Sequence, residues 1–374
     1  MTPLDSALTL FAFTMFTHVL GASLVLGFSW LAFGLELAGR RRNDRTCVDS
    51  SRAISKAIVL IYATIGSLGT AITVELFALW PDFTKTLGTL LWWPFAFVAA
   101  SIIANFLMIA IYWYTFDRIG TSLHLAVGFF MALTSSLIPL NFRTIIAFTN
   151  QAVGLSENAV EPILLYANPS LPPLYAHTIF ASLSTAGFVI CATAALGIYM
   201  KRGDAAVNNS LFRQGVTVGV GFLVPQALAG AWYLWTLGQN VPRMFAAVTG
   251  LYTQYSGVAD TQLFLPNVFA LKLTFVGYLI LAGMWLRSAS ERETLSKLAI
   301  AVAATVGLLA SGIILIGETM QEYSHLPYLI IDRFKASELL NAGFPFSAVG
   351  IFIVGFGVFF GILLTILYVA YVKE

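Results

Sequence analysis

The sequence predicts an all-α integral membrane protein with about nine transmembrane helices. Of its 374 residues, 58% are hydrophobic and 10% are charged, whereas a soluble domain carries roughly 25% charged residues. A transmembrane helix needs roughly 20 predominantly apolar residues. The predicted spans cover about residues 8–35, 54–80, 89–115, 122–148, 173–200, 212–238, 265–287, 297–319 and 344–371. We expect residues 1–374 to form one polytopic membrane domain.

Two of the spans have distinctive starts. The first apolar segment is too long for the core of a signal peptide and has no basic residue before it, so we expect it to be retained as a span. Pro172 and Pro173 mark the predicted start of the fifth span, since proline is tolerated in the first turn of a helix. The longest loops on the side opposite the basic residues run about 149–172, 239–264 and 320–343.

Basic residues gather on one side of the predicted membrane. They follow the first, third, fifth and seventh spans, whereas the opposite loops hold acidic or mixed charges. Cytoplasmic loops carry the excess of lysine and arginine, so we predict an N-terminus outside and a C-terminus in the cytoplasm. The basic residues are Arg40, Arg41, Arg42, Arg45, Arg52, Lys56, Arg118, Lys201, Arg202, Arg213, Arg287, Arg292 and Lys297.

Charge and cysteine content exclude several kinds of function. The net charge of +2 is nearly neutral and no basic patch forms, so we expect no nucleic acid partner. The two cysteines, Cys47 and Cys191, fall in a predicted cytoplasmic loop and inside a span, which argues against a structural disulfide. Without a Cys-x-x-Cys-His motif, covalent c-type haem is excluded, and two cysteines cannot hold a four-cysteine iron–sulfur cluster.

Ionisable side chains within the spans gather in the outer half of the predicted membrane. Such residues are costly in hydrocarbon and therefore mark functional sites. They are His18, His177, Glu75, Glu318, Glu322, Arg143 and Lys272. An imidazole or carboxylate can bind haem iron, and arginine or lysine can pair with haem propionates. The alternative is that each histidine only hydrogen-bonds a neighbouring helix.

Small residues favour the haem interpretation. They follow His18 by three and four residues and His177 by four and seven, so each imidazole has room for a macrocycle on its own helix face. These small residues are Gly21, Ala22, Ala181 and Ser184.

The other two histidines are weaker candidates. His124 starts the fourth span next to Asp117 and Arg118, and we expect it at the cytoplasmic interface. His325 lies just outside the eighth span, where it either meets a propionate, passes protons or is solvated.

Several segments resemble subunit I of the cytochrome bd quinol oxidases, and the resemblance runs over the nine-span layout and most of the chain. The most specific is Gly317-Glu-Thr-Met-Gln-Glu322-Tyr, where the family reads Gly-Trp-x-x-x-Glu-Tyr. The others are Phe16-Thr17-His18, the stretch from Gly69 through Glu75 to Trp80, Phe116-Asp117-Arg118-Ile119-Gly120 through His124, and Ala176-His177-Thr178.

The resemblance implies a set of haem ligands. His18 and Glu322 would be axial ligands of two high-spin haems, and His177 would be one ligand of a low-spin haem b. Lys272 matches a family arginine near the propionates. The cofactors would be two or three haems b, with haem d as an alternative at a high-spin site.

Roles follow for the remaining buried groups. We assign Arg143 to cofactor binding, and Glu322 and Glu75 to catalysis. Glu75, Glu318 and His325 are the titratable residues near the predicted haems and are therefore candidates for handling protons.

The chain departs from the family pattern at three places. Thr274 stands where the family has the methionine ligand of the low-spin haem, so that haem is five-coordinate, ligated by another residue, or missing. Phe97 and Asn105 stand where the family's third helix has two glutamates that serve the haem d site and its proton path. The loop 239–264 is far shorter than the family's quinol-binding loop, which calls quinol oxidation on this subunit into question.

The expected function is electron transfer through b-type haems in a cytochrome bd-like respiratory oxidoreductase of a prokaryotic cytoplasmic membrane, with dioxygen as the most concrete acceptor. The expected partners are a second polytopic subunit and a quinol or periplasmic cytochrome donor. One alternative is a haem-bearing subunit of a larger complex with another donor or acceptor. Another is a haem-free secondary transporter that couples through the buried charges, which their outer-half position argues against.

Overall fold

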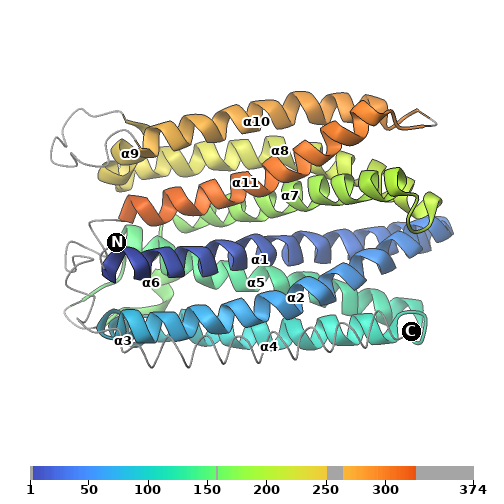
Figure 1. The fold of residues 1–374 in the computed structure, drawn as a ribbon. Coiled ribbons are helices and arrows are strands. Elements are labelled where there is room, and N and C mark those ends of the chain that lie inside the picture. Colours follow the sequence, from blue (N-terminus) through green and yellow to red (C-terminus); the bar gives the residue numbers. More distant parts are fainter. Residues whose placement is uncertain (1–2, 157–158, 251–263, 293, 326–374) are drawn as a thin grey trace.

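Long helices run side by side along one axis in a computed structural model of the chain, which describes residues 3–156, 159–250, 264–292 and 294–325 (Figure 1). The long helices are α1 (Pro3–Arg42), α2 (Arg45–Leu79), α4 (Trp92–Thr115), α5 (Thr121–Asn150), α7 (Leu171–Met200), α8 (Ala205–Asn240), α10 (Phe264–Ala289) and α11 (Lys297–His325). Shorter helices are α3 (Pro81–Leu90), α6 (Pro162–Tyr166) and α9 (Pro242–Thr249).

The eight long helices are apolar enough to cross a membrane. They coincide with the first eight predicted spans, which confirms the all-helical membrane fold class. The ninth predicted span, 344–371, lies outside the described residues. The first two spans extend further than predicted, because α1 and α2 are separated only by Asn43 and Asp44. Asp44 caps α2 by accepting a hydrogen bond from the backbone N–H of Cys47 at 3.2 Å.

The short helices lie at the end of the bundle where α1 begins, which we call the N-terminal end (Figure 1). Helix α3 joins α2 to α4, and α6 and α9 lie within segments that were predicted as loops. Proline occupies the first turn of each short helix, where its missing N–H costs no hydrogen bond. The end at which α1 stops is called the opposite end below.

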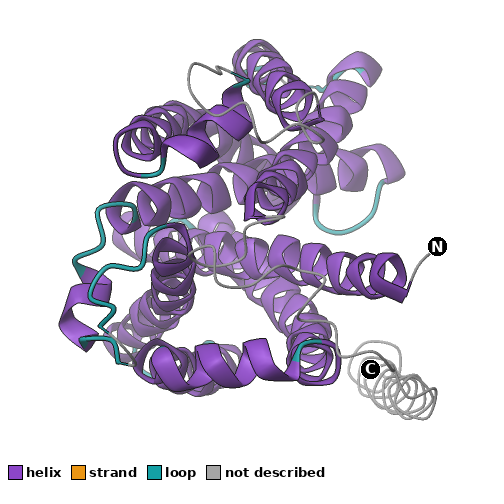
Figure 2. Ribbon diagram, turned by 90° about the vertical axis from the view of Figure 1, so that its left-hand side faces the viewer, coloured by secondary structure: helices purple, strands orange, loops and turns teal. Residues whose placement is uncertain are grey.

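The two largest apolar clusters of the described residues fill the middle of the bundle, and α7 contributes to both. One cluster joins α7 to α8, α10 and α11, and the other joins α7 to α1, α2, α4 and α5. Figure 2 shows these helices end-on. Helix α7 is the most buried of the eight spans, with 72% of its apolar window buried. Most side chains in the middle of α7 are therefore held by neighbouring helices.

Glycines bring α7 and α8 into backbone contact. A Cβ added at Gly187 would lie 2.4 Å from the backbone nitrogen of Gly219, and one added at Gly215 would lie 2.6 Å from that of Cys191. Small residues permit this kind of close approach between membrane helices. The α7–α8 pair consequently positions the groups described next.

Candidate functional site

His177 is seated between α7 and α8 by one backbone hydrogen bond. Its Nδ1 lies 3.0 Å from the carbonyl oxygen of Gln226, and a Cβ added at Gly230 would lie 3.0 Å from its Cε1. A carbonyl only accepts, so Nδ1 must donate and carry a proton. Among the described residues no hydrogen bond is formed by Nε2. A neutral imidazole in this tautomer presents the Nε2 lone pair that binds a metal ion.

His18 is seated in the same way between α1 and α2. Its Nδ1 lies 3.1 Å from the carbonyl oxygen of Ile65, and a Cβ added at Gly69 would lie 2.9 Å from its Cε1. At both histidines the accepting carbonyl is four residues before the glycine. The Nε2 atom of His18 likewise has no hydrogen bond with the described residues. Both imidazoles are thus arranged as ligands whose orientation is fixed by the neighbouring helix.

A cavity of about 320 Å³ opens beside His177. Residues from α1, α5, α7, α8, α9, α10 and α11 line it, and most of them are apolar. The polar side chains at its wall include Arg143, Lys272, Glu318 and Tyr233. Pockets with apolar walls and few converging polar groups are typical of cofactor sites.

An ion pair crosses the wall of this cavity from α5 to α11. Both terminal nitrogens of Arg143 reach the carboxylate of Glu318, one of them at 3.4 Å from Oε2. The Nε atom of Arg143 donates to Thr178 Oγ1 at 2.9 Å. On the other side, a Cβ added at Gly317 would lie 3.4 Å from the Nζ atom of Lys272. The structure therefore groups the predicted residues His177, Arg143, Lys272 and Glu318.

A hydrogen-bonded triad that sequence reasoning missed adjoins the cavity. Asn150 Nδ2 donates to the hydroxyl of Tyr233 at 2.9 Å, and that hydroxyl donates to Gln321 Oε1 at 3.2 Å. Gln321 Nε2 in turn lies 3.3 Å from Asn150 Oδ1. Asn150 and Gln321 lie just beyond the predicted span ends at residues 148 and 319. Tyr233 lies inside a span but carries no charge there, so it was not predicted as a site residue, although buried tyrosine and amide groups need such partners.

Glu75 lies apart from this cavity, on the same helix pair as His18. It is 3% exposed, and its Oε1 accepts a hydrogen bond from Thr14 at 2.8 Å. Its Oε2 is buried without a hydrogen-bond partner among the described residues. A buried carboxyl oxygen of this kind requires an explanation such as an unseen partner or a catalytic role.

Other predicted positions fall outside the cavity. Thr274 is exposed, donates to the carbonyl oxygen of Ala270 at 3.0 Å, and is not part of the cavity wall. Two thioethers, Met244 and Met320, do line it. Glu322 and His325 belong to the last turns of α11, but their side chains lie outside the described part of the structure.

Two of the small residues near the histidines, Gly21 and Ser184, make contacts between helices. A Cβ added at Gly21 would lie 2.2 Å from Ile65 Cδ1, so the space beside Gly21 is filled by α2 and Gly21 serves helix packing. Ser184 donates to the carbonyl oxygen of Gly219 at 2.8 Å and likewise joins two helices. Ala181 does line the cavity.

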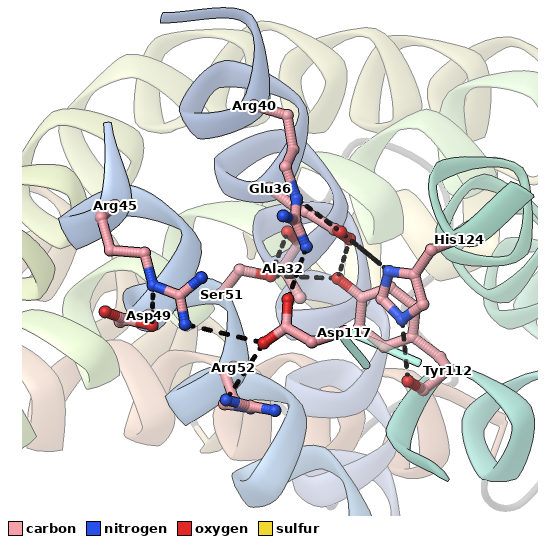
Figure 3. Close-up of polar contacts among 10 residues, drawn as sticks. All are labelled: Ala32, Glu36, Arg40, Arg45, Asp49, Ser51, Arg52, Tyr112, Asp117 and His124. Carbon is pink, nitrogen blue, oxygen red and sulfur yellow. Dashed lines mark hydrogen bonds and ion pairs between the residues drawn. The ribbon is translucent and has the colours of Figure 1, made fainter. Parts of the chain in front are cut away.

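His124 belongs to a separate cluster at the opposite end of the bundle (Figure 3). Its Nδ1 lies 2.8 Å from Glu36 Oε1, and its Nε2 lies 3.0 Å from the carbonyl oxygen of Tyr112. His124 is 1% exposed and Glu36 is 0% exposed, so this histidine, in the first turn of α5, is enclosed by protein at the end of its span. Sequence reasoning missed Glu36 because the first span was predicted to stop at residue 35.

Arginines extend this cluster to the surface. Arg40 Nη2 donates to Asp117 Oδ1 at 2.9 Å, and Arg45 and Arg52 lie 3.6 and 3.3 Å from Asp117 Oδ2 (Figure 3). Partial burial opposes ionisation of Asp117, but the hydrogen bond from Arg40 and the charges of the arginines outweigh it and lower the pKa of Asp117.

Comparisons with known proteins agree with this architecture. The sequence profile of the family described as "Cytochrome bd terminal oxidase subunit I" matches residues 7–268. A Bacillus subtilis (strain 168) protein described as "Putative cytochrome bd menaquinol oxidase subunit I" is 23% identical over 260 residues. That alignment covers 67% of this chain and 59% of the relative, so it spans less than two thirds of the relative's length.

A solved structure shows the same fold. The bd oxidase of Geobacillus thermodenitrificans aligns with a TM-score of 0.84 and 20% sequence identity, covering 100% of this chain and 99% of the solved chain. Fold and site together define a polytopic membrane protein with two imidazoles oriented by backbone carbonyls inside its helix bundle. The chain belongs to the cytochrome bd terminal oxidase subunit I family.

The residues present fit the haem cofactors that this family implies. His177 and His18 each combine a proton held on Nδ1 with an available Nε2. The cavity beside His177 has apolar walls and the cations Lys272 and Arg143, which suit a porphyrin ring and its propionates respectively.

Proposed function

We propose that this chain is the haem-bearing subunit of a cytochrome bd-type respiratory oxidoreductase that passes electrons from quinol to dioxygen. The observation that carries the proposal is the paired seating of His18 and His177, each with Nδ1 bound to a backbone carbonyl on the neighbouring helix. Bound haem would supply one-electron transfer and dioxygen chemistry. The family resemblance supports Glu322 as a third iron ligand.

Each residue near the cavity has a defined task in this proposal. His177 Nε2 binds iron, Lys272 pairs with a propionate, and the apolar wall excludes water and lowers the local dielectric. We propose that Met244 or Met320 supplies the second ligand, since thioethers are haem ligands and both line the cavity. Two or three haems b in total would be held by His18, His177 and Glu322.

We further propose Glu75 as a proton-handling group, because its Oε2 is buried without a described partner. The family's third-helix route is not supported here. Phe97 is 48% exposed, and Asn105 is used to join α4 to α5 by donating to the carbonyl oxygen of Met131 at 2.9 Å. Protons must therefore travel by other residues.

The proposed setting is a prokaryotic cytoplasmic membrane with the N-terminal end of the bundle outside. The charge distribution of the loops supports this orientation. We propose a second polytopic subunit as partner by family membership. Quinol is the proposed donor, and a periplasmic cytochrome is the second candidate because the segment 239–264 is short. Family membership does not favour the haem-free transporter.

The test is an optical and kinetic assay of the purified complex from haem-replete cells. We expect reduced-minus-oxidised bands of haem b, and dioxygen consumption when quinol is supplied. Consumption only with reduced cytochrome c would select the second donor. A haem-containing complex that consumes no dioxygen with either donor would favour a subunit serving another acceptor, and a colourless preparation would overturn the proposal.

A further inference from the structure

Glu318 places a negative charge on the wall of the His177 cavity. It stands where the family motif quoted above has tryptophan, and it is buried with 7% of its surface exposed. Both of its oxygens are engaged by Arg143. A carboxylate bound by a guanidinium through two contacts of this kind is fixed in place by charge-assisted hydrogen bonds.

The ion pair is anchored beside the proposed iron ligand. Arg143 Nε donates to Thr178 Oγ1 at 2.9 Å, and Thr178 is the residue after His177 on α7. Thr178 itself donates to the carbonyl oxygen of Leu174 at 2.9 Å. The charges of Arg143 and Glu318 therefore cannot move away from the cavity without breaking contacts to the helix that carries His177.

Lys272 adds a second positive charge to the same wall. Its Nζ lies next to Gly317, the residue before Glu318, and it forms no hydrogen bond or ion pair with the described residues. The wall thus contains two cations and one carboxylate. Removing the carboxylate would leave both cations facing the cofactor in a medium of low dielectric, where charges act strongly on one another.

A purely structural role does not account well for the pair. The desolvation of two buried charges roughly cancels their attraction, so a buried ion pair is weak evidence of a gain in stability. Its position in a cofactor cavity gives it an electrostatic consequence instead. Ferric haem carries one more positive charge than ferrous haem, so a fixed carboxylate nearby favours the ferric form.

We propose that Glu318 sets the reduction potential of the haem bound at His177, holding it lower than the two cations alone would allow. The inference rests on the proposed function, because it requires haem at His177. It identifies Glu318 as a positioning residue that acts through the field in the cavity and not by binding iron.

The test is a spectroelectrochemical titration of the purified complex carrying Glu318→Gln. Glutamine keeps the shape and can still accept a hydrogen bond from Arg143, but it removes the charge. We expect the ferrous-to-ferric ratio of this haem at fixed ambient potential to rise about tenfold, equal to a shift of about 59 mV for one electron. Glu318→Asp should stay near the wild-type potential.

Two comparisons keep the test decisive. Glu161→Gln removes an exposed carboxylate outside the cavity and should leave the potential unchanged. If Glu318→Gln does not accumulate, two variants that both lack Arg143 are compared at alkaline pH. One is Arg143→Gln alone, and the other combines Arg143→Gln with Glu318→Gln. The double variant, which also lacks the carboxylate, should have the higher haem reduction potential. Unchanged potentials with full haem content would overturn this inference alone, whereas colourless wild-type protein would overturn the proposed function.

Discussion

His177 and His124 both lie inside the bundle on long helices, one partly buried and the other fully buried, but their two ring nitrogens are used differently. His177 engages Nδ1 with a carbonyl and leaves Nε2 without a described partner. His124 engages Nδ1 with Glu36 and Nε2 with the carbonyl oxygen of Tyr112. Both ring nitrogens of His124 are therefore engaged by oxygen atoms, so neither is available to bind iron, whereas Nε2 of His177 is.

The surroundings of the two histidines also differ in whether they leave room for a ligand. Around His124, the hydroxyl of Tyr112 donates to Glu36 Oε2 at 2.8 Å, and Arg40 lies 3.5 Å from Glu36 Oε1 (Figure 3). The polar groups around His124 are therefore bound to one another. Around His177 a cavity and the ammonium of Lys272 remain available. We infer that the first cluster joins α1, α4 and α5 to one another and that the second binds a ligand.

The largest effect should come from removing the imidazole of His177. We expect His177→Ala to lose one haem per chain completely, because no other described side chain can replace its Nε2 atom as the proposed iron ligand. A pyridine haemochrome assay counts the haems, and a reduced-minus-oxidised spectrum identifies which one is missing. Its counterpart His18→Ala should remove a different haem. If His177→Ala retains the full haem content, the contrast drawn between the two histidines is wrong.

A smaller effect is expected from His124→Leu, which acts on stability and not on haem content. Removing His124 leaves the buried Glu36 with only the hydroxyl of Tyr112 and the more distant Arg40 as partners, at a cost of about 3 kcal/mol in the free energy of unfolding, the low end for breaking a buried ion pair. Thermal unfolding of the purified complex in detergent measures the change. The folded fraction should keep every haem.

The matched control for this change is the double variant Glu36→Leu, His124→Leu. It should recover most of the lost stability, because replacing a buried pair by apolar side chains is often neutral. Loss of a haem from folded His124→Leu protein would show instead that His124 is a ligand.

The smallest effect is expected from Asp117→Asn at the exposed edge of the same cluster. The pKa of Asp117 is lowered in the folded protein, so its contribution is present above the ordinary aspartate pKa of about 3.9 and is lost as the pH falls through the lowered value. We expect a loss of about 1 kcal/mol or less at neutral pH. Unfolding curves of the two proteins should converge on acidification, and a difference that persists at acidic pH would contradict this account.

Apolar length was enough to predict eight spans, because a helix that crosses a membrane must satisfy its backbone internally and be long enough. Depth along the spans also placed Arg143, Lys272 and Glu318 near His177, where the structure has them at one cavity. The ends of the spans were less predictable. Because α1 continues to Arg42, Glu36 lies inside the bundle. Hydropathy does not detect such an extension, since the added residues at the end of the helix are polar.

Contacts between distant segments could not be predicted from the sequence. The carbonyl groups of Ile65 and Gln226 carry no side-chain signal, although they decide which nitrogen of each histidine is available. The pairing of Arg143 with Glu318 joins residues 175 positions apart. Gly21 shows an error of the opposite kind, in which the sequence suggested a contact that the structure does not have. A small residue three positions after a histidine can serve helix packing as readily as it can make room for a cofactor.

The sites that orient the two imidazoles are built from main-chain atoms, and this affects how far sequences of this kind can diverge. Each site requires a neighbouring helix to supply a carbonyl group and a glycine whose missing side chain leaves room for the ring, as at Gly69 and Gly230. The side chains at the accepting positions take no part in the hydrogen bond. Two proteins can therefore retain the same imidazole orientation while sharing few other residues, which is compatible with a common fold at 20% identity.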